Sequence, residues 1–344
     1  MTTLLERPDA PPTPPAPSRT RKRILPRAVS GQEWILLGVI AALWIALGAF
    51  TPAFLSANSI QPLFAYVTPI CLIGIGMTIV ITTGGIDVSV AGMLLVCAVV
   101  TAKLLVDVGV SLGVAVAVSV LLGAFLGLLN GLLIAYGRVH PIIITFGTAN
   151  IFLFIGLTVF DSKVINGLPS TLEWFGRGEA GRTLGLPHAF VLTIILVAIA
   201  WWCMRHTVIG RHFYAIGGDP TAARLAGVKV ERLTVIAYVT TGAMVGLAAV
   251  ITLASGTSTL EPSVGAGQEL AVIAAVVIGG TSILGGRGSV FGTLLGAILV
   301  QTVSSGVTQL GWPSQLSELF VGVFIIIAVG TDILRQRARK GKRL

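Results

Sequence analysis

The sequence predicts an all-α polytopic membrane protein, and three observations lead to this fold class. Hydrophobic residues make up 54% of the 344 positions and charged residues only 11%, with a mean hydropathy of +0.93. A soluble domain carries about 25% charged residues. Apolar runs of membrane-spanning length recur along the whole chain. The 42 glycines suit such a protein, because small residues let membrane helices approach closely.

The amino-terminal segment, residues 1–33, is predicted to be a disordered, basic cytoplasmic tail. Five prolines between positions 11 and 17 oppose a helix, and basic residues from Arg19 to Arg27 follow them. The first apolar run, 34–50, is followed by many others. It is therefore expected to be a retained membrane helix rather than a cleaved signal peptide.

About ten transmembrane helices are predicted from the apolar runs, within one membrane domain at 34–333 that precedes a basic cytoplasmic tail at 334–344. Glycine-rich breaks near 82–88 and 284–289 are either tight turns or interruptions of a helix. The runs lie near residues 34–50, 62–82, 88–106, 110–136, 141–159, 188–204, 232–254, 266–284, 289–311 and 315–333.

Charge predicts the orientation of the chain. An even number of spans puts both termini on one side of the membrane. Placing them in the cytoplasm puts 19 of the 23 Lys and Arg residues inside, as the positive-inside rule expects. The same bias accounts for the net charge of +9, so no nucleic-acid partner is expected. Residues 160–187 then form an external loop and residues 205–231 a cytoplasmic loop.

No catalytic or metal site is predicted. Cys71, Cys97 and Cys203 lie in apolar runs without paired spacing, and the four histidines form no metal-binding pair. A G-x-S-x-G pattern at 109–113 connects two spans and lacks its strand–turn–helix context. The nucleotide-binding pattern G-x-x-x-x-G-K-[ST] does not occur. We therefore expect no cofactor here, and any ATP that drives this protein is expected on a separate chain.

The cytoplasmic loop contains the signals of a short helix, which we expect to receive force from another protein. Asp219 is a good helix cap, Pro220 suits the first helical position, and Gly227 can end the helix. Ala223 is expected to permit close approach of the partner. Arg224 is expected either to face that partner or the lipid surface, or to serve only as a topology determinant. The predicted coupling residues are Gly217, Gly218, Asp219, Ala222, Ala223, Arg224, Leu225 and Gly227.

Two glycine-rich breaks carry the next motifs, at Thr82–Ser89 and Gly279–Ser289. Asp87 is expected near the inner interface within reach of water. It either caps the following helix, contacts an ATPase, or handles substrate or protons. Glu269 is expected to stabilise the first turn of a helix, and Arg287 to be an inside anchor. The motif residues are Gly84, Gly85, Asp87, Ser89, Glu269, Gly279, Gly280, Gly285, Gly286 and Arg287.

Small and polar residues inside the apolar runs suggest how the helices pack. Two glycine trios repeat at intervals of four, Gly123/Gly127/Gly131 and Gly288/Gly292/Gly296, and predict two close-packing stripes in a two-half organisation. Whether the halves form an inverted or a parallel repeat stays open. Asn130, Asn150 and Gln301 either form interhelical hydrogen bonds or line a substrate pathway.

Over residues 34–333 the chain resembles the ribose-type ABC transporter permeases, a bacterial family of monosaccharide importers. The motifs that carry the resemblance are TTGGIDVSV, NGLLIAYGRVHPIIITFGT, AIGGDPTAARLAGV and ELAVIAAVVIGGTSILGGRGSVFGTLLGA, in this order, and the final span. The chain departs from the family pattern at Val88, where Leu is usual, and at Ala271, where an acid is frequent. The second departure argues against an essential acid at that position.

The resemblance implies a multi-pass permease of the bacterial inner membrane rather than an enzyme. Its implied partners are two cytosolic ATPase subunits that bind the ATP, a second permease (a copy or a paralogue), a periplasmic sugar-binding protein and the lipid bilayer. The loop around Asp219 would dock on the ATPase, and the substrate would pass between the two permeases. Ribose, rhamnose, another sugar or the furanosyl signal autoinducer-2 would be the cargo.

An ion-gradient-driven secondary transporter is the alternative function. It predicts buried acids or histidines in the middle of the membrane, whereas the acids of this chain are expected at interfaces. A membrane-embedded enzyme is a third class, for which the sequence offers no catalytic constellation.

Overall fold

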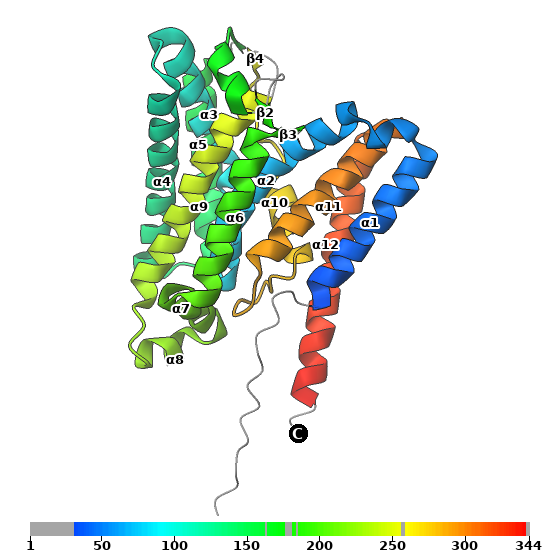
Figure 1. Cartoon of the computed structure of the whole chain (residues 1–344). Coiled ribbons are helices and arrows are strands. Elements are labelled where there is room, and N and C mark those ends of the chain that lie inside the picture. Colours follow the sequence, from blue (N-terminus) through cyan, green and yellow to red (C-terminus); the bar gives the residue numbers. More distant parts are fainter. Residues whose placement is uncertain (1–30, 162–163, 176–180, 184, 256–258, 342–344) are drawn as a thin grey trace, which may run out of the picture.

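The computed structural model describes residues 31–161, 164–175, 181–183, 185–255 and 259–341, with side chains described as far as residue 330 (Figure 1). The predicted amino-terminal tail lies outside these residues as far as position 30. Its last three residues, 31–33, are helical and not tail. The last helix continues to Gly341, into the predicted basic carboxy-terminal tail at 334–344, whose cytoplasmic position stays a prediction.

The predicted fold class is confirmed. Within the described residues, eight helical segments are long and apolar enough to span a membrane. They are α1 (Gly31–Phe50), α2 (Ala57–Thr82), α3 (Val90–Lys103) extended by the π-helical η2 (Leu104–Val108), α4 (Leu112–Gly137), α5 (Pro141–Phe160), α6 (His188–His206), α9 (Val230–Ser255) and α11 (Val290–Gln309). The shorter helices are η1 (Pro52–Leu55), η3 (Ser170–Phe175), α7 (Val208–Gly218), α8 (Pro220–Leu225) and α10 (Gln268–Ile278), and the apolar part of α12 (Gln315–Gly341) ends at Gly330.

Helix α10 differs most from its predicted span at 266–284. It has 11 residues, so it is about 16 Å long and about half as long as the hydrocarbon core is thick. Glycines with positive φ bound the helix: Gly267 (+76°) precedes it and Gly280 (+99°) follows it. These backbone conformations favour glycine and interrupt the apolar run on both sides. The second break is therefore an interrupted helix rather than a turn between two full spans.

The core forms where α4 and α9 pack against α2 and α3. The first glycine stripe is confirmed, because Gly123 and Gly127 of α4 lie directly on the backbone of α9. A Cβ added at Gly123 would clash with the carbonyl oxygen of Gly242, and one at Gly127 with that of Tyr238. Ser119 adds a hydrogen bond of 2.7 Å from its hydroxyl to the Gly246 carbonyl. Backbone contact this close requires small residues on both helices.

The second glycine stripe is confirmed in part. Gly292 and Gly296 of α11 pack against the backbone of Gly279 and Ala275 at the end of α10. Gly288 precedes α11 and instead lies against the side chains of Thr82 and Thr281, so it does not belong to the helical stripe.

The loops and short elements that connect the long helices lie at two opposite ends of the helical bundle. Figure 1 shows the start of α1, the pair α7–α8 and the end of α12 at one end, which agrees with termini and basic loops on one side. At the other end β1 (Ile165–Asn166) pairs antiparallel with β4 (Thr259–Leu260), and β2 (Arg182–Thr183) pairs with β3 (Leu186–Pro187). The predicted external loop is thus structured in its described parts; residues 162–163, 176–180 and 184 lie outside them.

Candidate functional site

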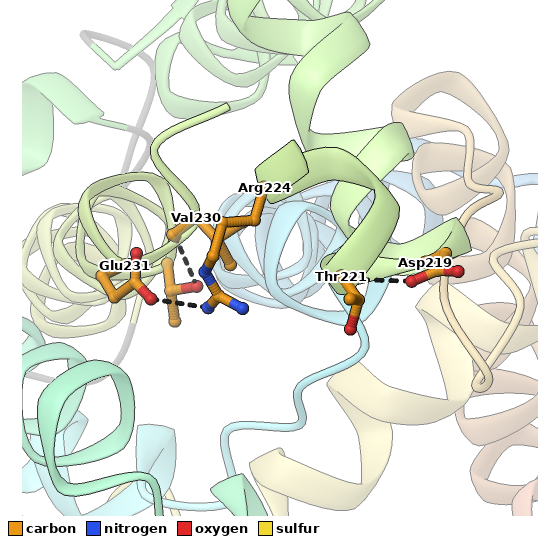
Figure 2. Close-up of polar contacts among 6 residues, drawn as sticks. Asp219, Thr221, Arg224, Val230 and Glu231 are labelled. Atoms are coloured by element: carbon orange, nitrogen blue, oxygen red, sulfur yellow. Dashed lines mark hydrogen bonds and ion pairs between the residues drawn. The ribbon is translucent and has the colours of Figure 1, made fainter. Parts of the chain in front are cut away.

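The predicted short helix of the cytoplasmic loop is confirmed as α8. The Oδ1 atom of Asp219 accepts hydrogen bonds from the backbone N–H groups of Thr221 (2.9 Å) and Ala222 (3.0 Å), so it caps the helix as predicted (Figure 2). Pro220 occupies the first helical position. Gly227, at φ +84°, follows the end of the helix.

The sequence suggested that Ala223 lies on the exposed side of α8, but the structure exposes Leu225 instead. Ala223 is buried within this chain at 5% exposure, so the prediction that it meets a partner directly is wrong. Leu225 is 86% exposed, the largest value among the exposed large apolar side chains of the described residues.

Arg224 has a partner that the sequence interpretation did not foresee. Its Nη2 atom lies 2.6 Å from Oε1 of Glu231 at the start of α9, and Figure 2 shows the two side chains pointing toward each other. Both side chains are more than a third exposed, so the pair is expected to contribute less than about 1 kcal/mol to stability. It links α8 to the first turn of α9.

Helix α7, which the sequence interpretation treated as loop, connects α8 to the interior of the chain. Its buried residues Gly210, Phe213 and Ile216 recur every three positions, a pattern typical of a helix that packs on one face. Tyr214 on this helix donates a hydrogen bond of 2.9 Å to the carbonyl oxygen of Gly288. Burial raises the pKa of the Tyr214 phenol despite the lowering effect of the Arg205 charge, so the hydroxyl stays protonated as a donor.

Both glycine-rich breaks meet the end of α7. A Cβ on Gly217 would clash with the Thr82 carbonyl oxygen of the first break and with the backbone nitrogen of Gly286 in the second. A Cβ added at Gly285 would lie only 3.0–3.1 Å from backbone atoms of Gly217 and Gly84. We call this meeting point, formed by Thr82, Gly217, Gly285 and Gly286, the glycine seam. Gly218, the next residue, is exposed and has open space around it.

In the first break, Asp87 is completely buried, so its predicted position in reach of water is wrong. The N-cap position of α3 is Ser89, and Asp87 Oδ1 accepts hydrogen bonds from the Ser89 backbone (3.0 Å) and hydroxyl (2.6 Å). Asn130 of α4 donates to the same hydroxyl over 2.7 Å. Asn130 thus forms the interhelical hydrogen bond that was one of its two predicted roles. Gly85 lies close to the Tyr238 hydroxyl, where a Cβ would be only 2.6 Å from the oxygen.

The second break is held by the first turn of α1. The Ser289 hydroxyl, which caps α11 by accepting from Gly292 N–H, donates to the carboxylate of the buried Glu33. Gln32 donates to the Ile278 carbonyl over 3.3 Å, and its side chain lies beside Gly280. Within the break, Ser282 N–H donates to the Arg287 carbonyl over 3.0 Å. This anchoring of α1 was not predicted, because the residues involved are about 250 positions apart.

The remaining predicted residues lie elsewhere in the fold. Glu269 is in the first turn of α10, as expected, but lines a cavity with Asn150 and is away from the glycine seam. Gln301 lines a different cavity between α2 and α11. Within the described part of the chain, no group of three His, Cys, Asp or Glu side chains is placed to hold a metal ion.

The chain is similar to known membrane permeases over most of its length. Residues 59–329 match the family described as "Branched-chain amino acid transport system / permease component". The ribose import permease protein RbsC of Bacillus subtilis (strain 168) is 39% identical over 282 residues, which cover 81% of this chain and 86% of the relative. The fructose import permease protein FrcC of Rhizobium meliloti is 32% identical (86% and 84% covered). The D-allose transport system permease protein AlsC of Escherichia coli (strain K12) is 33% identical (82% and 85%). No solved structure matches the chain.

Proposed function

The chain belongs to the family of branched-chain amino acid transport system permease components, and on this premise we propose that it is the membrane permease of an ATP-driven importer of a monosaccharide or a related polyol or furanosyl compound. It is a multi-pass membrane protein of the ribose type of sugar permease. The relatives named for ribose, fructose and allose support this function over an ion-gradient-driven transporter. Asp87 is a buried acid of the kind that the alternative predicts: its Oδ1 accepts two hydrogen bonds from Ser89, and its Oδ2 has no partner among the described residues. The preference for the importer therefore rests on the relatives.

The observation that carries the proposal is the connection from α8 through α7 to both breaks. In this mechanism a cytosolic ATPase, a separate chain, contacts Leu225 and the exposed side of α8. Closure of the ATPase displaces α8, and α7 moves with it because only Asp219 separates the two helices. At the glycine seam, Gly217 has no free space against Thr82 and Gly286, so the displacement reaches α2–α3 and α10–α11 together.

The other partners follow from the same arrangement. A second permease, a copy or a paralogue, completes the pathway. A periplasmic binding protein delivers the sugar to the external end, where the β1–β4 pair lies. ATP is bound by the partner ATPase, and this chain contributes no nucleotide site to the complex.

Reconstitution tests the proposal. Proteoliposomes that contain the permease, the ATPase and the binding protein should accumulate radiolabelled ribose, fructose or allose only when ATP is present on the ATPase side. A matched preparation lacking the ATPase, given a proton or sodium gradient instead, should accumulate none. Uptake driven by the gradient alone would reject the ATP-driven importer in favour of a secondary transporter.

A further inference from the structure

A cavity of about 330 Å³ opens between α3, α5 and the segment before α10, and it has no role so far. Its volume is at the lower end of the range for small-molecule sites, roughly 300–1,000 Å³. On α5 its lining runs from Phe146 to Leu153, the middle of a 20-residue helix that spans the membrane. The cavity therefore lies at mid-depth rather than at either surface.

The segment that closes one side of the cavity is non-helical. Residues 262–267 form turns, with Gly265 and Gly267 at positive φ, and Gly265 lies against Ala91 and Leu94 of α3. Pro262, Ala266 and Gly267 are exposed. Irregular backbone at membrane depth is tolerated only where protein buries it or where it lines a water-filled space. This chain leaves the segment exposed, so in the proposed complex this side of the cavity faces either water or the second permease.

Asn150 supports the same conclusion from the opposite side. It lies at the middle of α5 and is exposed, and its amide donates only to the Phe146 carbonyl of its own helix, over 2.9 Å. A polar amide is costly in lipid, and such side chains in spanning helices face a cavity or another helix. The face of α5 that carries Asn150 is therefore turned toward the cavity that it lines or toward a helix of the second permease.

The chemistry of the lining indicates the ligand. Glu269 contributes a carboxylate to the lining, and its Oε2 is buried without a hydrogen-bond partner among the described residues. Asn150 adds an amide, and Phe146, 63% exposed, adds an aromatic face. Glu269 is the one charged residue in the described lining, so the cavity repels anions such as sugar phosphates. Apolar walls with a few hydrogen-bonding groups suit an uncharged polyhydroxylated molecule.

We propose that this cavity is the part of the sugar pathway that the permease contributes, and that Asn150, Glu269 and Phe146 contact an uncharged sugar as it crosses the middle of the membrane. The inference rests on the proposed function and adds to it the substrate-contacting residues. It also distinguishes between the three residues that the sequence offered as possible lining of a substrate pathway. Asn150 contacts the cargo, whereas Asn130 holds the first break and Gln301 lies in another cavity.

Transport per ATP tests the sugar contacts. In the reconstituted complete importer, Glu269→Gln and Asn150→Leu should lower the amount of ribose, fructose or allose moved per ATP hydrolysed. The expected loss is about tenfold for Glu269→Gln, the size expected for one hydrogen bond to a charged acceptor. ATPase co-purification should not change, because both residues lie far from α8. Glu318→Gln, which changes an exposed first-turn glutamate of α12, is the matched control and should transport normally.

A matched phenylalanine pair tests the aromatic contact. Phe146→Leu should reduce transport per ATP, whereas Phe154→Leu, two turns further along α5 and 69% exposed, lies outside the cavity and should not. If the two variants behave alike, the aromatic contact is rejected. If wild-type protein itself shows no ATP-driven uptake, the proposed function fails rather than this inference.

Water access gives a readout that does not depend on transport. In a Cys203→Ser background, where Cys71 and Cys97 are buried, Leu153→Cys and Leu157→Cys place thiols one turn apart on α5. Leu153 lines the cavity, whereas Leu157 is similarly exposed but lies outside it. A membrane-impermeant methanethiosulfonate should label Leu153→Cys about tenfold faster, because thiols form little thiolate in apolar surroundings. Equal labelling of both would overturn the water-filled pathway.

Discussion

Gly286 donates its backbone N–H to the carbonyl oxygen of Thr82 over 2.9 Å, and this bond joins two breaks that are about 200 residues apart in the sequence. Gly217 of α7 lies against both of these backbone groups. The bond therefore closes a three-way contact between α2, the break before α11 and the cytoplasmic loop. A displacement of any one of the three strains the other two.

Gly217→Ala tests this contact. The added methyl group would overlap the Thr82 carbonyl and the Gly286 nitrogen, so we expect a loss of about 1–3 kcal/mol in the free energy of unfolding, the usual cost of overpacking. Gly218→Ala is the matched control, since its Cβ meets nothing within 4 Å. Thermal unfolding of the two purified variants is the measurement. Equal stability for both would contradict the tight contact at the seam.

Leu225→Glu tests the contact with the ATPase. The variant should insert into the membrane normally, because the side chain is 86% exposed, and should lose co-purification with the ATPase. Leu225→Met keeps an apolar side chain of similar volume and should retain binding. Ala223→Glu is expected to act differently, by placing a charge at a buried position and lowering the yield of folded protein. Normal ATPase binding by Leu225→Glu would remove α8 from the coupling role.

Ser89→Ala tests the buried polar contacts of the first break. The change removes one of two donors to Asp87 and the acceptor of the Asn130 amide, and we expect a loss of about 1–3 kcal/mol in stability. Because Ser89 and Asn130 share one hydrogen bond, the effects of Ser89→Ala and Asn130→Leu should not add in a double-mutant cycle. Thr101→Val, at a buried threonine bonded only to its own helix, should be the milder change. Strict additivity would mean that the two side chains act independently.

Gly127→Ala tests the first glycine stripe. Its Cβ would overlap the Tyr238 carbonyl of α9, so the α4–α9 contact should open and folded yield should fall. Gly113→Ala, near the start of the same helix and free of neighbours within 4 Å, should fold as well as wild type. Yields and melting temperatures in detergent distinguish the two outcomes. A stable Gly127→Ala protein would contradict the close packing.

Arg224→Gln tests the exposed ion pair with Glu231. The loss of stability should stay below about 1 kcal/mol and should shrink further in high salt, since both side chains are partly exposed. Membrane insertion of the variant reports separately on whether Arg224 determines topology. A large, salt-independent loss of stability would show that the pair is less solvated than its exposure indicates.

Local signals predicted much of the fold. Apolar runs located the helices, glycine spacing located the α4–α9 contact, and the Asp219–Pro220 pair located the start of α8. These features depend on residues within a few positions of one another. The same reasoning failed for α10, because its apolar residues continue past Gly280 while the backbone does not. It also missed α7, whose 11 residues are too short to stand out from a cytoplasmic loop.

The glycine seam and the cavity at Asn150 could not be predicted in the same way. Each depends on segments that are distant in sequence, such as Thr82 with Gly286 or Asn150 with Glu269. Burial was equally hard to judge. Asp87 follows two glycines and looks like an interfacial residue, yet Ser89 and the packing of α4 and α9 enclose it. Whether Ala223 faces its own chain or a partner depends on how α7 packs against α8. The sequence of one short helix does not show that packing.

The attachment of α1 has a consequence for the synthesis of the protein. Trp44 donates to the Thr302 hydroxyl over 3.1 Å, and the two residues are 258 positions apart. At about 5–20 residues per second, the ribosome needs roughly 13–50 seconds to make the chain between them. During this interval the first helix has entered the membrane without its partner α11. Its most apolar window has a mean hydropathy of 2.0 and is only 11% buried in the finished fold. The helix is thus apolar enough to remain in lipid until α11 has been made.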